Sequence, residues 1–112
     1  MTVSIILPTY NRSRFLNEVI NSVLNQTYKD FELIIIDDGS NDNTRTLVKE
    51  YKDSRIVYFY QRNQGVIKAR NAGIRIAKSK IIAFIDSDDP WYQDKLNLQM
   101  KIIKNKNLDW CF

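Results

Sequence analysis

Four short apolar runs recur along the chain, and longer polar stretches separate them. The runs are rich in β-branched residues and span Val3–Leu7, Phe31–Ile36, Ile56–Tyr60 and Ile81–Ile85. Polar or turn-forming residues bound each run, a pattern that predicts β-strands. In the second and fourth runs apolar residues follow one another without alternation, as in strands that helices cover on both faces.

Helical periodicity fills the stretches after the runs. Four apolar stripes carry it: Phe15, Leu16, Val19, Ile20, Val23 and Leu24; Leu47, Val48 and Tyr51; Ala69, Ala72, Gly73, Ile76 and Ala77; and Leu96, Met100 and Ile103. The small residues of the third stripe predict a helix that lies close on the sheet. Asp89 and Pro90 precede the fourth and are predicted to be its N-cap and first helical residue. Alternating strands and helices predict an α/β domain whose mostly parallel, Rossmann-like sheet is flanked by helices.

The chain length predicts one domain, residues 1–112, because 112 residues with 44% hydrophobic content build one core. Leu108–Phe112 reads as the start of another strand. We therefore expect the sheet to be truncated at the C-terminus and the chain to be a fragment of a longer protein.

The charge and composition of the chain limit the kinds of partner and catalysis that it can have. The net charge of +4 comes from 17 basic and 13 acidic residues. The basic residues are dispersed, so no nucleic-acid partner is expected, although peripheral contact with anionic lipid is compatible. Histidine is absent, which excludes imidazole metal sites and Ser/His or Cys/His catalysis within this sequence.

The lone cysteine and the lack of a long apolar stretch bear on localisation. Cys111 cannot form an intrachain disulfide, which favours a reducing compartment. No apolar stretch reaches the roughly 18 residues of a membrane span, and the N-terminus has no export signal. We expect a cytoplasmic protein, compatible with a peripheral place at the inner face of the membrane.

Three loops with chemically reactive or aromatic side chains follow the predicted strands. They are Pro8–Arg12, Asp37–Ser40 and Asp86–Asp89. In open parallel sheets, ligands bind beyond the carboxyl ends of the strands, so these loops are predicted to line one crevice.

The first two loops each allow two interpretations. Tyr10 can present a flat face to a planar base, or its loop can be a turn in which Asn11 or Ser13 caps the first helix. Asp37–Ser40 suits a tight turn, and a carboxylate there can instead accept a hydrogen bond from a ring N–H such as that of uracil. Arg70 and Asn71, near the start of the third helix, can reach the same crevice and favour an anionic ligand.

The acidic loop is the strongest indication of chemistry. Crowded carboxylates repel one another, and a divalent cation among them removes the repulsion. A role as helix N-cap explains the presence of Asp89, but it leaves Asp86 and Asp88 unexplained. The i, i+2 spacing of these two residues lets both carboxylates approach one ion or nucleotide from the same side. Oxygen ligands favour Mg²⁺ or Mn²⁺ over Zn²⁺.

Four segments in register resemble the nucleotide-sugar-binding part of family 2 glycosyltransferases, which have the GT-A fold. They are Ile5–Arg12, Ile36–Ser40, Asn63–Gly73 and Phe84–Asp89. The resemblance implies a glycosyltransferase that binds a nucleotide-sugar donor, such as a UDP-sugar, with Mn²⁺ or Mg²⁺. It also implies transfer of the sugar to a hydroxyl of a saccharide or lipid-linked acceptor.

The resemblance also implies roles for single residues. Tyr10 matches the residue that packs on uracil, Asp38 the carboxylate that contacts the base, and Thr9 and Arg70 line the same pocket. Asp86 and Asp88 match the ends of the Asp-X-Asp motif: the first commonly contacts the ribose and the last binds the metal.

The family's catalytic base lies in its C-terminal half, beyond residue 112, so the base is not assigned. We expect the chain alone to bind a donor rather than to turn it over. The alternative is a non-catalytic nucleotide or nucleotide-sugar binding module. A dinucleotide-binding domain is disfavoured because the first strand is followed by Pro-Thr-Tyr-Asn-Arg-Ser instead of Gly-x-Gly-x-x-Gly.

Overall fold

The structure is a computed structural model, and it describes residues 2–106. The elements follow the order β1 (Val3–Thr9), α1 (Ser13–Leu24), β2 (Phe31–Asp37), α2 (Thr44–Lys49), β3 (Ile56–Tyr60), α3 (Val66–Ile76), β4 (Ile81–Phe84) and α4 (Lys95–Lys106). The predicted α/β alternation is confirmed. The strand expected from Leu108 lies outside the described residues.

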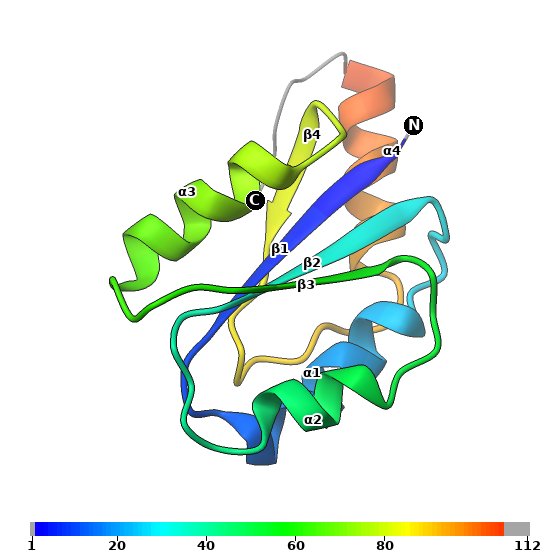
Figure 1. The fold of residues 1–112 in the computed structure, drawn as a ribbon. Coiled ribbons are helices and arrows are strands. Elements are labelled where there is room, and N and C mark those ends of the chain that lie inside the picture. The colour runs from blue at the N-terminus through cyan, green and yellow to red at the C-terminus, as the bar shows by residue number, and fades with distance from the viewer. Residues whose placement is uncertain (1, 107–112) are drawn as a thin grey trace.

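The strands form one parallel sheet in the order β3-β2-β1-β4. The chain builds outward from β1 through β2 to β3, and then crosses to the other side of β1 to add β4 (Figure 1). The strand order therefore reverses between β1 and β4. In open α/β sheets such a switch point is where a crevice forms at the carboxyl ends of the strands.

Helices cover the sheet on two faces (Figure 1). Alternate residues of β1 and β2 pack against α1, α2 and α4, and the intervening ones pack against α3. Ile34, Ile35 and Ile36 are fully buried, as the unbroken apolar run predicted. The small-residue stripe also packs as expected: Ala69, Ala72 and Gly73 are the buried residues of α3.

Burial of β4 on both faces is a wrong prediction. Its residues are only partly buried, and Phe84 is 45% exposed. The physical reason is position, because β4 is at an edge of the sheet. Ile81 and Ala83 pack on the core beneath α4, while Phe84 pairs in register with Ile6 and so lies on the α3 face, beyond the reach of that helix's small residues.

β1 extends two residues beyond its predicted end and includes Pro8 and Thr9. Proline normally interrupts a central strand because it cannot donate to the ladder. Here Ile6 accepts a bond from Ile85, so alternate residues of β1, Pro8 included, direct their backbone groups toward β4. The register between β1 and β4 ends at Ile6, so the missing N–H of Pro8 interrupts no ladder bond.

The expected start of α4 is also wrong. The helix begins at Lys95, so Asp89 and Pro90 lie in the preceding loop and do not cap it. Asp89 N instead donates to Asp86 O at 3.3 Å, which closes a turn within the acidic loop. The side chain of Gln26, from beyond the end of α1, supplies an acceptor for the first turn of α4 at 2.9 Å from Leu96 N.

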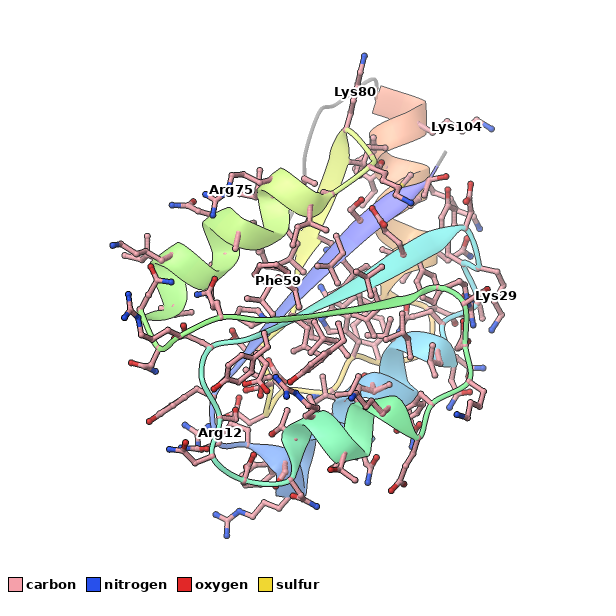
Figure 2. All side chains as sticks on the ribbon, viewed as in Figure 1. Arg12, Lys29, Phe59, Arg75, Lys80 and Lys104 are labelled. Atoms are coloured by element: carbon pink, nitrogen blue, oxygen red, sulfur yellow. The ribbon has the colours of Figure 1, made fainter. Side chains whose placement is uncertain are left out.

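Side chains of the whole described chain are drawn in Figure 2. Basic residues such as Arg12, Lys29, Arg75 and Lys104 project outward at well-separated points, in agreement with the dispersed charge of the sequence (Figure 2). In the described part of the chain, no helix has the length and apolar character needed to cross a membrane.

Candidate functional site

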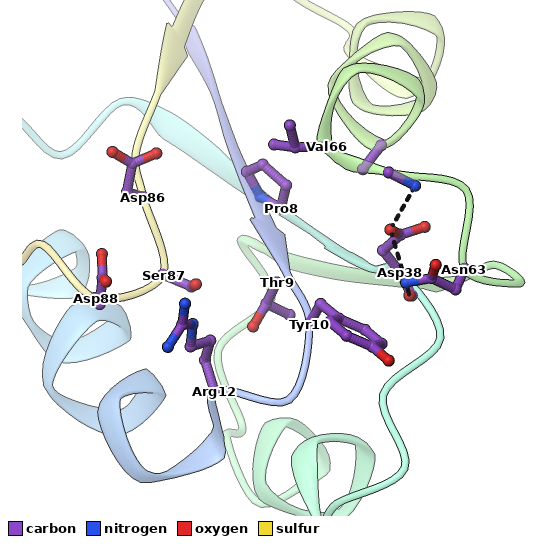
Figure 3. A pocket seen from close by; sticks show the side chains of 12 residues that line it. Pro8, Thr9, Tyr10, Arg12, Asp38, Asn63, Val66, Asp86, Ser87 and Asp88 are labelled. Atoms are coloured by element: carbon purple, nitrogen blue, oxygen red, sulfur yellow. Dashed lines mark hydrogen bonds between the residues drawn. The ribbon is translucent and has the colours of Figure 1, made fainter.

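A cavity of about 370 Å³ opens at the carboxyl ends of β1, β2 and β4, at the switch point of the sheet (Figure 3). Residues from the three predicted loops and from the start of α3 surround it. They are Pro8, Thr9, Tyr10, Arg12, Asp38, Asn63, Gly65, Val66, Ala69, Asp86, Ser87 and Asp88.

Asp38 stands at one end of this cavity, with only 4% of its surface exposed. Its Oδ1 accepts hydrogen bonds from Gln61 Nε2 and Gln64 N, both at 2.9 Å. Its Oδ2 accepts from Gly65 N at 2.9 Å and from Asn63 Nδ2 at 3.3 Å. A carboxylate offers about four acceptor positions. Protein donors therefore occupy all four acceptor positions of the Asp38 carboxylate. These hydrogen bonds fasten the loop between β3 and α3 to the end of β2.

Gly39 permits that fastening. Its φ is +87°, and a Cβ on it would lie 2.7 Å from Asn63 N, closer than side-chain atoms normally come to backbone. Only glycine combines the left-handed backbone with the missing Cβ that this approach requires. Gly39 thus allows the tight turn, while Asp38 beside it forms part of the cavity wall.

Thr9 and Tyr10 form the floor and one side of the cavity. Thr9 is 3% exposed, and its hydroxyl Oγ1 has no hydrogen-bond partner among the described residues. Buried polar atoms are normally paired, so an orphaned hydroxyl on a cavity wall indicates a bound polar group as its partner. Tyr10 is 45% exposed, which leaves a ring free beside Asp38 for stacking (Figure 3).

Two of the loops are bound directly to each other. Asn11 N donates to Ser40 Oγ at 2.9 Å, and Asn41 N donates to Asn11 Oδ1 at 2.8 Å. Asn11 adopts φ of 52°, a left-handed conformation that asparagine tolerates better than most residues. Asn11 therefore joins the loops after β1 and β2 rather than capping α1.

Asp42 caps α1 from the second loop. Its Oδ2 accepts from Ser13 N at 3.2 Å, while its Oδ1 accepts from Thr44 N and Thr44 Oγ1 at 3.1 and 2.5 Å. Burial alone would raise the pKa of Asp42, but the hydrogen bonds from Thr44 and Ser13 outweigh it and lower that pKa. The predicted cap by Ser13 or Asn11 is not made, because the acceptor comes from a distant segment.

Asp37 lies beneath the cavity and does not line it. It is 1% exposed, accepts from Ser40 N at 2.9 Å and from Tyr58 Oη at 2.5 Å. Burial, and then the hydrogen bond to Asp37, raise the pKa of Tyr58 to about 12. Of the two neighbouring aspartates, the first thus supports the fold and the second reaches the cavity.

The acidic loop forms the end of the cavity opposite Asp38 (Figure 3). Asp86 and Asp88 are exposed, and the guanidinium of Arg12 lies beside Ser87 (Figure 3). Within residues 2–106, no three acidic, cysteine or histidine side chains gather closely enough to hold a metal by themselves. A cation at this end of the cavity would therefore have one or two carboxylate ligands from these residues, an arrangement that suits a hard cation with further positions for water and a ligand's oxygens.

Asn71, which was expected to reach this cavity, does not line it, and neither does Arg70. Arg70 lines a neighbouring hollow of about 410 Å³ with Phe84, Trp91 and Lys95, and Asp86 is common to both. Arg70 Nη2 lies 3.6 Å from Asp86 Oδ1, and the guanidinium lies 5.7 Å from the centre of the Phe84 ring. Arg70 is therefore linked to the first cavity only through its contact with Asp86, which lines both hollows.

Sequence reasoning placed Thr9, Tyr10, Asp38, Asp86 and Asp88 in one crevice, and the structure brings all five to one cavity. It did not single out Arg12 or Asn63, which also line it. Arg12 carried a signal, because it is the cation nearest to Tyr10 in the same loop. Asn63 begins one of the resembling segments, but nothing local marked it as a cavity residue, since its place depends on bonds to Asp38 across 25 positions of sequence.

Fold and cavity together define the class: an open α/β domain with a polar cleft at its topological switch point. The chain belongs to glycosyl transferase family 2, whose family model matches residues 4–111. The predicted GT-A type of fold is confirmed by the solved structures that match it.

A characterised relative is the Escherichia coli UDP-Glc:alpha-D-GlcNAc-diphosphoundecaprenol beta-1,3-glucosyltransferase WfgD. It is 41% identical over 111 residues, which cover 98% of this chain and 44% of WfgD. The curated relatives are longer proteins, and the chain spans between 15 and 45% of their lengths.

The matching solved structures include complexes with ligands. Staphylococcus aureus TarS 1-349 in complex with UDP-GlcNAc superposes with a TM-score of 0.90 at 29% identity, covering 96% of this chain and 32% of that one. The mannosyltransferase PcManGT from Pyrobaculum calidifontis, in complex with GDP-Man and Mn²⁺, gives 0.85 at 26% identity, covering 90% and 32%.

Proposed function

We propose that residues 1–112 are the nucleotide-sugar-binding part of a metal-dependent glycosyltransferase that uses a UDP-sugar. One observation carries the proposal: a single cavity joins a free aromatic ring and a buried carboxylate at one end to two exposed carboxylates at the other. A nucleoside diphosphate has the matching order of groups, with a planar base at one end and a charged diphosphate at the other.

The base end of the site is formed by Tyr10, Thr9 and Asp38. The exposed Tyr10 ring stacks on the base, and the orphaned Thr9 hydroxyl gains a polar partner from the ligand. Asp38 has no spare acceptor position, so a base N–H must take the place of a protein donor. Asn63 Nδ2, the longest of the four contacts at 3.3 Å, is the donor that yields most easily.

The diphosphate end is formed by the acidic loop and Arg12. Asp88 holds Mn²⁺ or Mg²⁺, Asp86 contacts the ribose, and Arg12 adds positive charge at the cavity wall. A divalent cation held by Asp88 would supply Lewis-acid stabilisation of the leaving diphosphate. Arg70 restrains the Asp86 carboxylate from the neighbouring hollow. The catalytic base is not assigned to any residue of this chain.

The relatives guide the remaining proposals. WfgD is named for a UDP-Glc donor and a GlcNAc-diphosphoundecaprenol acceptor, TarS is seen with UDP-GlcNAc, and PcManGT with GDP-Man and Mn²⁺. A saccharide or lipid-linked acceptor is therefore proposed for the whole protein. A lipid-linked acceptor agrees with a cytoplasmic protein placed peripherally at the membrane.

Calorimetric titration with UDP, with and without Mn²⁺, tests the proposal. We expect Mn²⁺ to raise the affinity of the chain for UDP, and Asp88→Asn to remove that increase while leaving metal-free binding unchanged. Asp89→Asn is the matched control, because Asp89 is an exposed neighbour that does not line the first cavity.

Equal UDP affinity in all these titrations would refute the metal assignment. Binding of UDP without any metal effect would favour the alternative, a nucleotide-binding module without metal-dependent transfer. No UDP binding under either condition would refute the donor site itself.

A further inference from the structure

The acidic loop is held at both of its ends. At its start, Ile85 N donates to Ile6 O at 3.0 Å, which extends the pairing of β4 with β1. At its end, residues 91–96 lie against the C-terminal end of α1. Between these two anchors are residues 86–90, which contain the three aspartates.

Gln26 is the centre of the second anchor. It follows α1 directly after the C-cap Asn25, and its side chain is fully buried. Its Nε2 donates to Tyr92 O at 2.7 Å and to Ser22 O at 3.1 Å, and its Oε1 accepts from Leu96 N at 2.9 Å. One amide thus holds the segment at two points, on either side of the turn that starts α4.

Residues beside Gln26 complete the anchor. Ser22 Oγ accepts from Trp91 N at 3.0 Å, and Thr27 N donates to Gln93 O at 3.1 Å. Thr27 Oγ1 also donates to Asp94 Oδ1 at 2.9 Å. The backbone of residues 91, 92, 93 and 96 is therefore bonded to residues 22–27, none of which lines the cavity.

We propose that Gln26 and Ser22 are positioning residues, which fix the acidic loop in the geometry that a divalent cation needs before the cation arrives. The proposal rests on the proposed function. Its physical reason is that three aspartates in a row of four residues repel one another, so a loop tethered only at β4 would spread them apart. Fixing the loop in advance removes the ordering cost from the binding step.

Substitution of the anchor should weaken metal-dependent binding selectively. Partners that bond directly to metal ligands typically contribute 10- to 100-fold to metal affinity. Gln26 and Ser22 bond to residues 91, 92 and 96 and not to the aspartates, so we expect an effect at the lower end of this range. We expect Gln26→Met, which keeps the volume and removes the amide, and Ser22→Ala to reduce the Mn²⁺-dependent gain in UDP affinity about tenfold. Metal-free UDP affinity should stay unchanged, because Tyr10 and Asp38 lie at the other end of the cavity (Figure 3).

Two controls separate positioning from general damage. Gln93→Met makes the same replacement at an exposed glutamine of the same segment and should leave the gain unchanged. Ser22→Thr keeps the hydroxyl and should retain the Mn²⁺-dependent gain in UDP affinity. An unchanged gain in folded Gln26→Met and Ser22→Ala would overturn the proposal, as would an equal loss in metal-free binding. If Gln26→Met does not fold, Ser22→Ala decides alone.

Amide hydrogen exchange on the metal-free chain tests the anchor without the proposed function. We expect faster exchange at residues 86–96 in Gln26→Met and Ser22→Ala, and unchanged exchange in β2. If the wild-type chain shows no metal effect on UDP binding, the proposed function fails while this measurement still decides whether the anchor orders the loop. Unchanged exchange at residues 86–96 would overturn the anchor.

Discussion

At the scale of single residues, Asp38 has two tasks that one carboxylate rarely combines. It accepts four hydrogen bonds from the loop between β3 and α3, and it also lines the cavity. Asp88 has only the second task, because it is exposed and lies within the loop between β4 and α4. The same substitution at the two positions therefore separates folding from binding.

Asp38→Asn should destabilise the chain by about 2 kcal/mol, since the amide turns one acceptor into a donor that faces backbone N–H groups. Asp88→Asn should change the free energy of unfolding by no more than about 0.5 kcal/mol. Urea denaturation of both variants measures the difference. Equal stability of the two would contradict the structural task of Asp38.

At the scale of elements, α3 lies close against β1 because Gly73 has no side chain. A Cβ on Gly73 would lie 2.5 Å from Ile6 Cγ2, and both residues are buried in the middle of their elements. The helix can lie at this distance only where it has no side chain. Since residues at the start of α3 line the cavity, the contact also sets one wall of the site.

Gly73→Ala should therefore destabilise the chain by about 1–3 kcal/mol, the cost of overpacking, although alanine favours a helix by up to about 1 kcal/mol. Asn71→Ala, on the exposed side of the same helix, provides the control and should be neutral or stabilising. Thermal and urea unfolding measure both. A more stable Gly73→Ala would show that the helix can move away from the sheet at little cost.

The turn before β3 holds that edge strand to β2. Asp53 accepts from Arg55 N at 2.9 Å and from Arg55 Nη2 at 2.7 Å, while Leu33 N donates to Arg55 O at 2.8 Å. The Arg55 guanidinium also lies 4.4 Å from the centre of the Phe31 ring. Hydrogen bonds from the Arg55 side chain, and then from its backbone, lower the pKa of Asp53 to about 2.

A carboxyl whose pKa is lower in the folded state stabilises the fold above its unfolded pKa and loses that effect as the pH falls. Asp53→Asn should thus cost about 1 kcal/mol at pH 7, a value discounted for partial exposure, and the difference from wild type should vanish between pH 4 and 2. Urea denaturation across this range measures it. A constant difference between Asp53→Asn and wild type across this range would exclude the ionic contribution.

At the scale of the whole molecule, the sheet order places two loops from opposite ends of the chain side by side. β4 lies next to β1 in the sheet (Figure 1), so the acidic loop and the loop carrying Tyr10 line the same cavity (Figure 3). The described residues thereby build the cavity that we propose as the donor site. The curated relatives extend well beyond the matched length. Binding of the donor and transfer of its sugar can therefore be measured as separate properties, the first on this chain and the second on a full-length relative.

We expect the 112-residue chain to bind UDP-glucose with Mn²⁺ but to release no UDP above the rate without protein. The reason is that a bound donor also needs an acceptor and a positioned base for in-line attack. A coupled assay for UDP measures release, with a full-length relative as the positive control. Metal-dependent release by the chain alone would contradict this expectation.

The sequence by itself determined the elements and the edge of the sheet that carries the chemistry. Apolar runs and stripes are local patterns, so they predicted four strands, four helices and the small-residue face of α3. The rule that parallel strands end at one edge then brought the Tyr10, Asp38 and Asp88 loops together. The ends of elements were less certain, and the expected cap at Asp89 was wrong because the acceptor for α4 is a distant glutamine.

Only the tertiary structure decided which polar groups meet. It filled the acceptor positions of Asp38, placed Arg70 beside Phe84 and outside the first cavity, and bonded Gln26 to the segment that follows the acidic loop. These contacts join residues that lie between 14 and 70 positions apart. No local periodicity encodes such pairs, because each depends on how neighbouring elements are oriented after the core has packed.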